Sequence, residues 1–406
     1  MGEPMVVRGA PGAIDQYLAA LEDGASMLVV PRAPYPGREL VIEHFRTLVA
    51  GPVLVTNLHD PGTTVTGTGN AGGAAIGFHT SGSTNHPKCV IYSRERVVAH
   101  ADAIVAAIGL SADTAHVACT PPHFAYGLSI VHSHWRSAIP VRFVAAASPA
   151  ELSSALAGLA GPLSLYLLPH QASMLLAGDL APDRLRSLRI AGGRLSAGAA
   201  HHLAQRFPDL ELVNMFGQAE LGPRLALWRG PITDFTEGRI GRPIEGVEFD
   251  LGPANDEGRF PLLARTVFAM DHVIAPPYER VQPGPAPGEF VPTGDSAHRE
   301  PPTGQSAEYV HDGRLDHFAN VAGTKVDLQL IAQGIQQRFP VVSVKVSTER
   351  SAATGETRPV VQIVPAPDRQ ISAVEVRRAL HEQWRSLVAL MDIRVVDHID
   401  VGEAGK

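Results

Sequence analysis

The segment from residue 79 to 90, HTSGSTNHPKCV, has the composition that most directly suggests chemistry in this chain. It combines small hydroxylated residues with a glycine, and it follows an apolar run, AAIGF, that predicts a strand. The backbone N–H groups and hydroxyls of such a loop can surround phosphate oxygens, and Lys88 adds a positive charge at its end. It is not a Walker loop, because Pro87 stands where that pattern needs a glycine before the lysine. The segment predicts a phosphate-binding loop between a strand and a helix, with a plain polar turn as the alternative.

This segment resembles the phosphate-binding loop T-S-G-T-T-G-x-P-K-G of the adenylate-forming superfamily. That family includes acyl-CoA synthetases, carrier-protein adenylation domains and luciferases. Asn85 and Cys89 stand where the family usually has glycine; asparagine tolerates positive φ, and Cys89 is interpreted as a small packed residue. The resemblance implies that Lys88 is catalytic and that the loop binds ATP. The matching residues are Thr80, Ser81, Gly82, Ser83, Thr84, Pro87 and Lys88.

Residues 214–220, NMFGQAE, are similar to the family pattern N-x-Y-G-x-T-E. The resemblance implies that Phe216 stacks on adenine and that Glu220 coordinates Mg²⁺, a cation that prefers carboxylate oxygens. Ala219 replaces the usual threonine, and alanine at this position is familiar from members that activate aryl acids. The residues that this match places beside the nucleotide are Asn214, Met215, Phe216 and Gly217.

Further matches follow in the family's order. They are Gly192-Gly193, GRIGRP at 238–243, TGD at 293–295, GRLD at 313–316 and GK at 405–406. The resemblance implies that Gly192 and Gly193 approach the adenine and acyl group, that Asp295 binds the ribose hydroxyls, and that Arg314 holds ribose or phosphate. It makes Asp316 the hinge of a mobile C-terminal domain. It also implies that Lys406 bridges the substrate carboxylate and the α-phosphate.

The stretch PPHFAYGL at 121–128 corresponds to the part of the family that lines the acyl pocket. Amino-acid-activating members place an aspartate where Ala125 stands, and salicylate activators place an asparagine there. Ala125 disfavours both substrate classes, and the remaining side chains suggest an apolar, flat or short acyl group. The alternative is that several of them only pack the core. The candidate pocket residues are His123, Phe124, Ala125, Tyr126 and Leu221.

Apolar runs of strand length alternate with segments of helical spacing, which predicts an α/β protein with large parallel or mixed sheets. Glycine- and proline-rich segments after residue 231 predict a small β-rich subdomain, and a small α+β domain is expected after the hinge. The expected domains are 1–230, with a shortened first subdomain, then 231–316 and 317–406. The expected strands are 25–31, 74–80, 116–122, 141–147, 163–169, 188–193 and 210–216, and the expected helices are 14–24, 94–110, 149–161 and 197–208.

Composition excludes several other classes of protein. The net charge is −7, which gives no reason to expect nucleic-acid binding. No apolar run is long enough for a membrane span, the N-terminus does not resemble a secretory signal, and there are two cysteines. We therefore expect a cytoplasmic protein.

The GTGNAG run at 67–72 fits G-x-G-x-x-G but precedes a strand, so we interpret it as a flexible linker. The histidines at 132, 134, 201 and 202 are interpreted as surface or packing residues and not as metal ligands.

By this resemblance the protein is expected to use ATP and Mg²⁺ to convert a small carboxylic acid into an acyl- or aryl-adenylate and pyrophosphate. The acyl group would then pass to a thiol, either CoA or the phosphopantetheine of an acyl carrier protein. Three alternatives stay open: an amine or other non-thiol acceptor, an unusual acid or a group other than carboxylate, and a degenerate AMP-binding regulatory module. The shortened N-terminal stretch raises the expectation of a homodimer.

Overall fold

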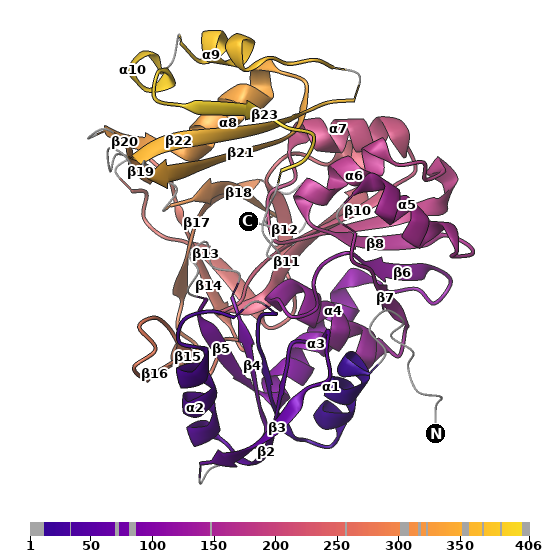
Figure 1. Ribbon diagram of the computed structural model, residues 1–406, viewed down its shortest axis with the longest axis vertical. Helices are drawn as coiled ribbons and strands as arrows, with labels where there is room; N and C mark the ends of the chain where they lie inside the picture. Colours follow the sequence, from indigo (N-terminus) through magenta and orange to yellow (C-terminus); the bar gives the residue numbers. More distant parts are fainter. Residues whose placement is uncertain are drawn as a thin grey trace.

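The structure is a computed structural model in which two large sheets and a smaller C-terminal sheet are stacked with helices between and around them (Figure 1).

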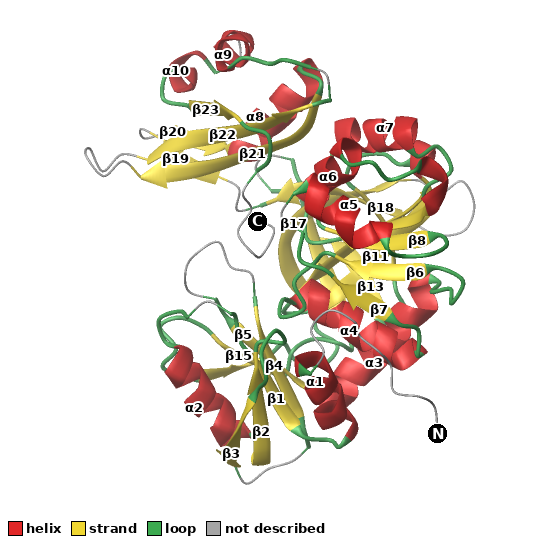
Figure 2. Ribbon diagram, turned by 45° about the vertical axis from the view of Figure 1, so that its right-hand side comes forward, coloured by secondary structure: helices red, strands yellow, loops and turns green. Residues whose placement is uncertain are grey.

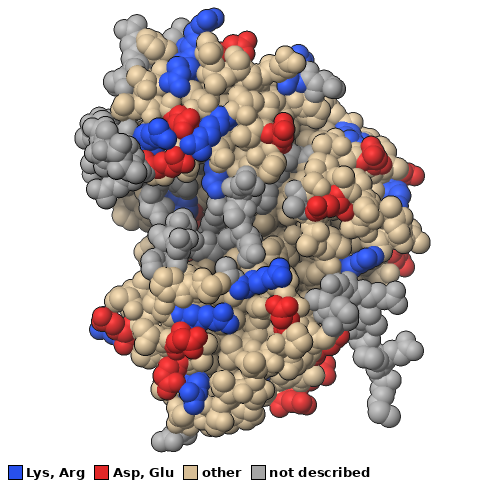
Figure 3. All heavy atoms as spheres, viewed as in Figure 1, with Lys and Arg blue, Asp and Glu red and all other residues tan. Residues whose placement is uncertain are grey.

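On the face drawn in Figure 3, positively and negatively charged side chains are interspersed among neutral ones, so neither sign dominates that face. Among the described residues, no helix is both long and apolar enough to cross a membrane. The structure describes residues 12–32, 34–69, 73–80, 87–146, 148–255, 258–300, 308–315, 318–321, 324–350, 357–367, 369–381 and 384–399.

The first sheet has seven strands in the described chain, in the order β16-β15-β5-β4-β1-β2-β3. Strand β1 pairs in parallel with both β2 and β4, and β5 pairs antiparallel with β4 and β15. The interior strand β1 is buried along its whole length, as expected for a strand covered on both faces. The strands are β1 Ser26–Val29, β2 Ala50–Thr56, β3 Thr63–Thr68, β4 Ala75–His79, β5 Cys89–Ser93, β15 His272–Ile274 and β16 Val281–Pro283.

The second sheet has eleven strands in the described chain, in the order β13-β14-β17-β18-β12-β11-β10-β9-β8-β6-β7. Its β6–β10 part is parallel, and the β10–β14, β17 and β18 part is antiparallel. The strands after residue 231 therefore largely continue this sheet. They are β6 Ala115–Ala118, β7 Val141–Phe143, β8 Leu163–Leu167, β9 Leu185–Ile190, β10 Glu211–Gln218, β11 Gly222–Pro231, β12 Arg239–Pro243, β13 Val247–Leu251, β14 Pro261–Thr266, β17 Val291–Glu300 and β18 Glu308–Arg314.

Helices α1, α3 and α4 fill the space between the two sheets and share one core with both of them. Helix α2 covers the other face of the first sheet through Val41 and Phe45, opposite α1, as Figure 2 shows. Helices α5, α6 and α7 cover the outer face of the second sheet. These helices are α1 Ala13–Glu22, α2 Arg38–Leu48, α3 Arg94–Ile108, α4 Ala125–Ser137, α5 Pro149–Ala157, α6 Ala172–Ala177 and α7 Ala197–Arg206.

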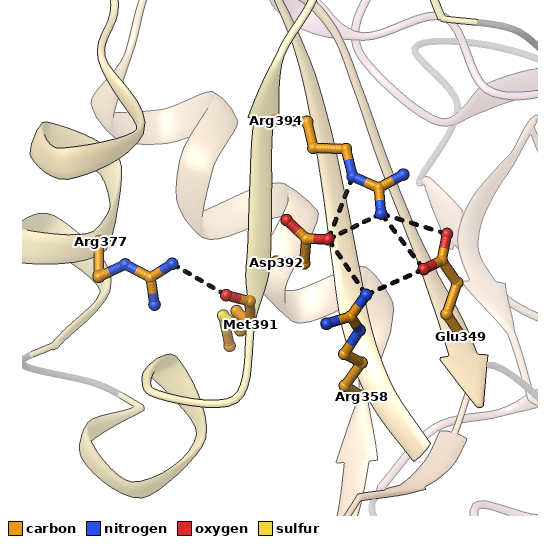
Figure 4. A network of polar contacts seen from close by, with 6 residues as sticks. All are labelled: Glu349, Arg358, Arg377, Met391, Asp392 and Arg394. Atoms are coloured by element: carbon orange, nitrogen blue, oxygen red, sulfur yellow. Dashed lines mark hydrogen bonds and ion pairs between the residues drawn. The ribbon is translucent and has the colours of Figure 1, made fainter. Parts of the chain in front are cut away.

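The C-terminal residues have a core of their own, built on a three-stranded sheet that is backed by helices. Glu349 and Asp392 share two arginines, Arg358 and Arg394, across neighbouring strands (Figure 4). This part contacts the rest of the chain where the Ser196 hydroxyl donates to the Val342 carbonyl at 3.1 Å. Its elements are β19 Phe318–Val321, β20 Thr324–Asp327, α8 Leu328–Arg338, β21 Val341–Arg350, β22 Thr357–Pro365, α9 Ala373–His381, α10 Arg385–Val388 and β23 Asp392–Val395. The domain boundaries given above stay a prediction.

Local sequence signals explain several element ends. Ser93, Ser148 and Ser196 each cap a helix, and each side chain accepts a hydrogen bond from a backbone N–H of the first turn. The expected α/β class and all the strands and helices predicted up to residue 216 are confirmed, whereas α2 and α4 were not foreseen. The linker interpretation of the GTGNAG run was wrong for Gly67, which lies in β3, where a Cβ would meet the Val49 carbonyl at 2.4 Å. Residues 70–72 lie outside the described chain.

The histidines of α4 pack inside the protein. The His132 Nε2 atom is 2.7 Å from the Tyr17 hydroxyl, and the His134 Nε2 atom is 2.8 Å from the Tyr166 hydroxyl. Burial lowers the pKa of His132 from 6.5 to about 3, and burial likewise lowers the pKa of His100 to about 4. The described residues contain no cluster of metal-ligating side chains. The packing interpretation of His132 and His134 is therefore confirmed.

Gly241, in the GRIGRP turn, has φ +70° and lies against β11, where an added Cβ would meet the Leu227 carbonyl at 2.1 Å. Gly161 has a similar φ of +73° with nothing within 4 Å of an added Cβ. We expect Gly161→Ala to cost roughly 1 kcal/mol from the left-handed backbone alone. Gly241→Ala should cost more, about 2–3 kcal/mol or beyond, because a backbone clash is added. Thermal unfolding midpoints measure this, and equal midpoints for the two variants would contradict it.

The buried neutral histidines predict that stability is lost in acid. Their pKa values in the folded protein lie below the ordinary 6.5, so the unfolded chain binds more protons between about pH 4 and 6.5. Stability should therefore be fully present above about pH 6.5 and should fall as the pH decreases. His132→Asn should reduce the proton uptake on unfolding by up to about one proton. The exposed His201→Asn is the control, and an unfolding midpoint that is flat from pH 7 to 5 would refute the expectation.

Candidate active site

The predicted phosphate loop starts and ends on two antiparallel strands, β4 and β5. The Thr80 N–H donates to the Lys88 carbonyl at 2.8 Å, and the Lys88 N–H donates to Oγ1 of Thr80 at 3.3 Å. The helix expected after the loop is confirmed as α3, which begins at Arg94. A strand that was not predicted, β5, lies between them and pairs with β4 on one side and β15 on the other. Cys89 is fully buried, as its interpretation as a packed residue requires. Four predicted loop residues lie outside the described chain: Ser81, Gly82, Ser83 and Thr84.

Lys88 and Glu220 come together although they are far apart in the sequence. The Lys88 ammonium lies 3.4 Å from Oε1 of Glu220, and both side chains are partly exposed. Glu220 lies in the turn between β10 and β11. The turn is fixed by a hydrogen bond from the Met270 N–H to the Glu220 carbonyl at 3.0 Å and by the Tyr92 hydroxyl, which donates to the Ala219 carbonyl. The second sheet thus presents a carboxylate to the lysine of the phosphate loop.

This arrangement suits a magnesium ion that is shared with a bound polyphosphate. Mg²⁺ keeps several waters and is usually held by one or two carboxylates together with phosphate oxygens. The described residues offer one partly exposed carboxylate here, that of Glu220, and no cluster of three metal-ligating side chains. The donor set therefore fits Mg²⁺ bound with a nucleotide and does not form an all-protein cage.

Asp295 is almost fully buried, and side chains from two other strands converge on its carboxylate. Gln218 Nε2 donates to Oδ2 at 2.8 Å and also to the Thr293 carbonyl. His311 Nε2 is 3.0 Å from Oδ1, and Arg314 Nε is 3.8 Å from the same oxygen. Asp295 and Arg314 are direct partners in the β17–β18 ladder, which explains their proximity. Two predicted nucleotide-binding residues therefore lie side by side.

Phe216 extends this group toward the rest of β10. Its ring centre is 5.7 Å from that of His311 and 6.0 Å from that of Phe249, and its side chain is only partly buried. A partly exposed ring beside Asp295 can stack on a nucleobase while the carboxylate binds the ribose. The Phe216, His311 and Asp295 side chains thus form one continuous surface.

Asn214 lies two residues earlier on the same strand. Its Nδ2 donates to the Arg239 carbonyl at 2.8 Å, while its buried Oδ1 has no hydrogen-bond partner among the described residues. A buried acceptor of this kind is suited to receive an N–H from a ligand. The Gly192 backbone has φ +80°, and an added Cβ would lie 2.9 Å from Leu168. Gly193 lies against Pro169, and Met215 is buried in the core.

Gly217 allows the hairpin to form. An added Cβ would lie 2.1 Å from the Pro223 carbonyl, and the β10–β11 register shifts between Phe216 and Gln218. The shift is a β-bulge, which redirects the side chains that follow it. Gln218 consequently reaches Asp295, and Glu220 reaches Lys88.

The predicted acyl-pocket residues lie at the start of α4, except Leu221, which lies in the turn between β10 and β11. Phe124 precedes the helix and forms a parallel bridge with His79, and His123 Nδ1 is 3.0 Å from His59 Nε2. Burial lowers the pKa of His123 to about 3, helped by the nearby His59. Ala125 lines a small space of about 20 Å³ between α3 and α4, room for one water. The two remaining candidates, Tyr126 and Leu221, are buried in the core.

Two predicted site residues, Lys406 and Asp316, lie outside the described chain. Sequence reasoning missed Gln218 and His311, which hold Asp295. Gln218 occupies an unspecified position of the N-x-Y-G-x-T-E pattern, so the pattern carried no signal for it. His311 lies three residues before Arg314, and its role follows only from the pairing of β17 with β18.

Comparison with known proteins gives a family and a fold. Residues 25–261 match the AMP-binding enzyme family. The chain is 30% identical over 344 residues to novobiocin biosynthesis protein H of Streptomyces niveus, covering 81% of this chain and 55% of that protein. It is 25% identical over 281 residues to the nonribosomal peptide synthetase inpA of Emericella nidulans, covering 64% and 18%. The chain therefore spans about half of the first relative's length and a small part of the second's.

Several solved structures share the fold at low sequence identity. The anthranilate CoA ligase AuaEII has a TM-score of 0.66 at 16% identity, covering 97% of this chain and 89% of that one. A benzoate CoA ligase from Burkholderia xenovorans LB400 has a TM-score of 0.66 at 14% identity, covering 96% and 90%. The amide bond synthetase McbA from Marinactinospora thermotolerans has a TM-score of 0.59 at 17% identity, covering 98% and 82%. The family match covers more than half of the chain, and the candidate site is assembled from residues of the motifs described above. The chain therefore belongs to the AMP-binding enzymes.

Proposed function

We propose that this protein activates a carboxylic acid with ATP and transfers the acyl group to a thiol. In the first step a carboxylate oxygen attacks the α-phosphorus of ATP, the bond to the bridging oxygen breaks, and pyrophosphate leaves. In the second step the acceptor sulfur attacks the acyl carbon, a thioester forms, and AMP leaves. The thiol proton goes to solvent or to a basic group.

The observation that carries this proposal is the convergence of two groups of side chains on one hairpin. Gln218 of β10 binds Asp295, and two residues later Glu220 faces Lys88. The Gln218–Asp295 and Glu220–Lys88 contacts together connect the phosphate loop of the first sheet with the ribose-binding candidates of the second. A nucleotide laid along the hairpin would have its base at Phe216, its ribose at Asp295 and its phosphates toward Glu220 and Lys88.

Each of these groups has a chemical task in adenylate formation. Lys88 and Arg314 supply positive charge for the phosphate oxygens, and such fixed charges stabilise the transition state more than the ground state. Asp295 has accepting capacity beyond its bonds to Gln218 and His311, because a carboxylate offers about four lone-pair positions. Mg²⁺ bound at Glu220 would supply further positive charge beside the phosphates. Lys406 is proposed to neutralise charge between the carboxylate and the α-phosphate, and Asp316 is proposed as the hinge for C-terminal domain movement.

The acceptor is proposed to be CoA or the phosphopantetheine arm of a carrier protein. The CoA ligases among the similar structures support the first, and the nonribosomal peptide synthetase relative supports the second. The amide bond synthetase supports an amine as the alternative acceptor. Incubating the enzyme with ATP, an accepted acid and each acceptor in turn, followed by mass spectrometry of the products, separates a thioester from an amide.

The first test is pyrophosphate exchange into ATP across a panel of acids. We expect exchange that depends on a cognate acid and on Mg²⁺, with Glu220→Gln reducing kcat/KM by about 100-fold or more because a charged metal ligand is lost. Glu211→Gln is the matched control, because Glu211 lies on the same hairpin but pairs with Arg229 on the surface. Nucleotide binding without exchange for any acid would favour a regulatory module instead. Full activity of Glu220→Gln would contradict the role given to Glu220.

The second test concerns the ribose side of the site. Asp295→Asn should raise the dissociation constant of ATP by about 10-fold or more, because charge-assisted hydrogen bonds to the ribose are weakened. Asp312→Asn, at a neighbouring position on β18 where Asp312 pairs with His298, should leave it unchanged. Isothermal titration with ATP measures both constants. Equal affinities for the two variants would place the ribose elsewhere.

A further inference from the structure

Arg224, near the start of β11, is a buried cation whose guanidinium has no hydrogen-bond partner among the residues that the structure describes. Its side chain is 1% exposed, and Nε, Nη1 and Nη2 all lack a partner among the described residues. Burial lowers the pKa of the Arg224 guanidinium, but an arginine stays protonated in proteins. A buried charge without a partner strongly opposes folding unless something compensates it. The position of Arg224 therefore requires an explanation.

The described side chains around Arg224 include two aromatic rings and a second arginine, and not an aspartate or a glutamate. Its guanidinium carbon lies 5.4 Å from the ring centre of Tyr126 and 5.8 Å from that of Tyr166. Arg189 of β9 is also buried, and its guanidinium carbon lies 5.3 Å from the ring centre of Tyr166. Within the described chain neither Arg224 nor Arg189 forms an ion pair with an aspartate or glutamate. The region is thus positively charged, with no counter-ion among the described residues.

The two tyrosine rings compensate this charge only in part. A cation over an aromatic face is attracted to the ring, but the ring gives the five guanidinium N–H groups no oxygen to bind. The Tyr126 hydroxyl donates its proton to the Arg189 carbonyl at 3.0 Å, and its oxygen accepts no hydrogen bond from Arg224. The Tyr166 hydroxyl lies 2.8 Å from His134 Nε2. The guanidinium therefore retains unused donors that suit a planar anion such as a carboxylate.

The position of Arg224 connects it with the acid-binding side of the site. It lies four residues after Glu220 on the same hairpin, and the residue between Gly222 and Arg224 is Pro223. Pro223 and Ala125 line the same small space between α3 and α4. Tyr126, whose face Arg224 covers, directly follows Ala125 at the start of α4. Pro223 and Tyr126 thus link Arg224 to the start of α4, where most of the acyl-pocket candidates lie.

We infer that the acid activated by this protein carries a second carboxylate, which binds the guanidinium of Arg224 while the first reacts with ATP. The substrate class is therefore a dicarboxylic acid. This inference rests on the proposed function and adds the chemical class of the acid. The bound carboxylate supplies the counter-ion and the acceptors that the described part of the chain does not offer. A neutral acyl group at this place would leave the guanidinium without either.

The experiment compares dicarboxylic acids with their half-amides in pyrophosphate exchange, using aliphatic and aromatic acids of graded length. A half-amide has nearly the same shape but lacks the second charge. For the wild-type enzyme we expect at least one dicarboxylic acid to exceed its half-amide by about 100-fold or more in kcat/KM, because a site built for a polar group strongly rejects an analogue without it. Exchange with monocarboxylic acids alone would overturn the inference while leaving the proposed function intact. Exchange with no acid at all would overturn both.

Substitutions of Arg224 test the residue itself. Arg224→Gln keeps hydrogen-bonding groups but removes the charge, and it should abolish the preference for the dicarboxylic acid mainly through a higher KM. Arg229→Gln, on the same strand but paired with Glu211 at the surface, should keep the preference. An unchanged preference in Arg224→Gln would show that the arginine is not the anion-binding group.

A stability measurement distinguishes binding from packing without relying on activity. Replacing a buried, unpaired charge by an apolar side chain of similar length removes its desolvation cost, so ligand-free Arg224→Met should melt at or above the wild-type temperature. The cognate dicarboxylic acid should raise the melting temperature of the wild type but not that of Arg224→Met. A clearly lower melting temperature of the ligand-free variant would show that the two tyrosines hold Arg224 as a structural cation, and would overturn the inference.

Discussion

The buried carboxylate of Asp295 is the constraint on which the nucleotide side of the site depends. A carboxylate that is 3% exposed has to be hydrogen-bonded, because an ionised group without partners is costly inside a protein. Gln218, His311 and Arg314 meet this requirement from β10 and β18. Their contacts fix the position of β10 relative to β17 and β18, which come much later in the chain. The same contacts align the Phe216 ring with the carboxylate. The hydrogen bonds that a buried Asp295 needs therefore also produce the geometry proposed for binding the base and the ribose.

The β10–β11 hairpin carries this arrangement across to the first sheet. The bulge at Gly217 redirects the chain, and the turn after it is held by the Tyr92 hydroxyl of β5 and by the Met270 N–H. Glu220 therefore lies within reach of Lys88, which closes the phosphate loop of the other sheet. A site built between two sheets needs such a bridge, since neither sheet contains both the ring proposed to bind the base and the loop proposed to bind phosphate.

The sequence predicted the elements that are buried on both faces and the motifs that need fixed residue types. The run at 163–169 is continuously apolar because β8 lies inside the second sheet, and it was recognisable for that reason. Helix α4 was missed because it is buried almost all around, so its residues show no alternation of apolar and polar faces. The TGD and GRLD motifs named Asp295 and Arg314, but their proximity depends on the β17–β18 register, which local patterns do not encode. Arg224 was also missed, since a charged residue in a strand normally indicates a solvent-facing position.

The buried histidines and the buried Arg224 between the two sheets differ in how they can respond to burial. The histidines can lose their proton: burial lowers the pKa of His100 to about 4, and neutral rings then find partners such as the Arg224 carbonyl, 2.8 Å from His100 Nε2. An arginine has no such route, because it remains charged at every physiological pH. The backbone of Arg224 is thus satisfied by the chain, whereas its guanidinium is not. Most other buried polar side chains of the described chain have a hydrogen-bond partner. The unpartnered guanidinium of Arg224 is therefore better explained by a ligand that brings negative charge than by a role in folding.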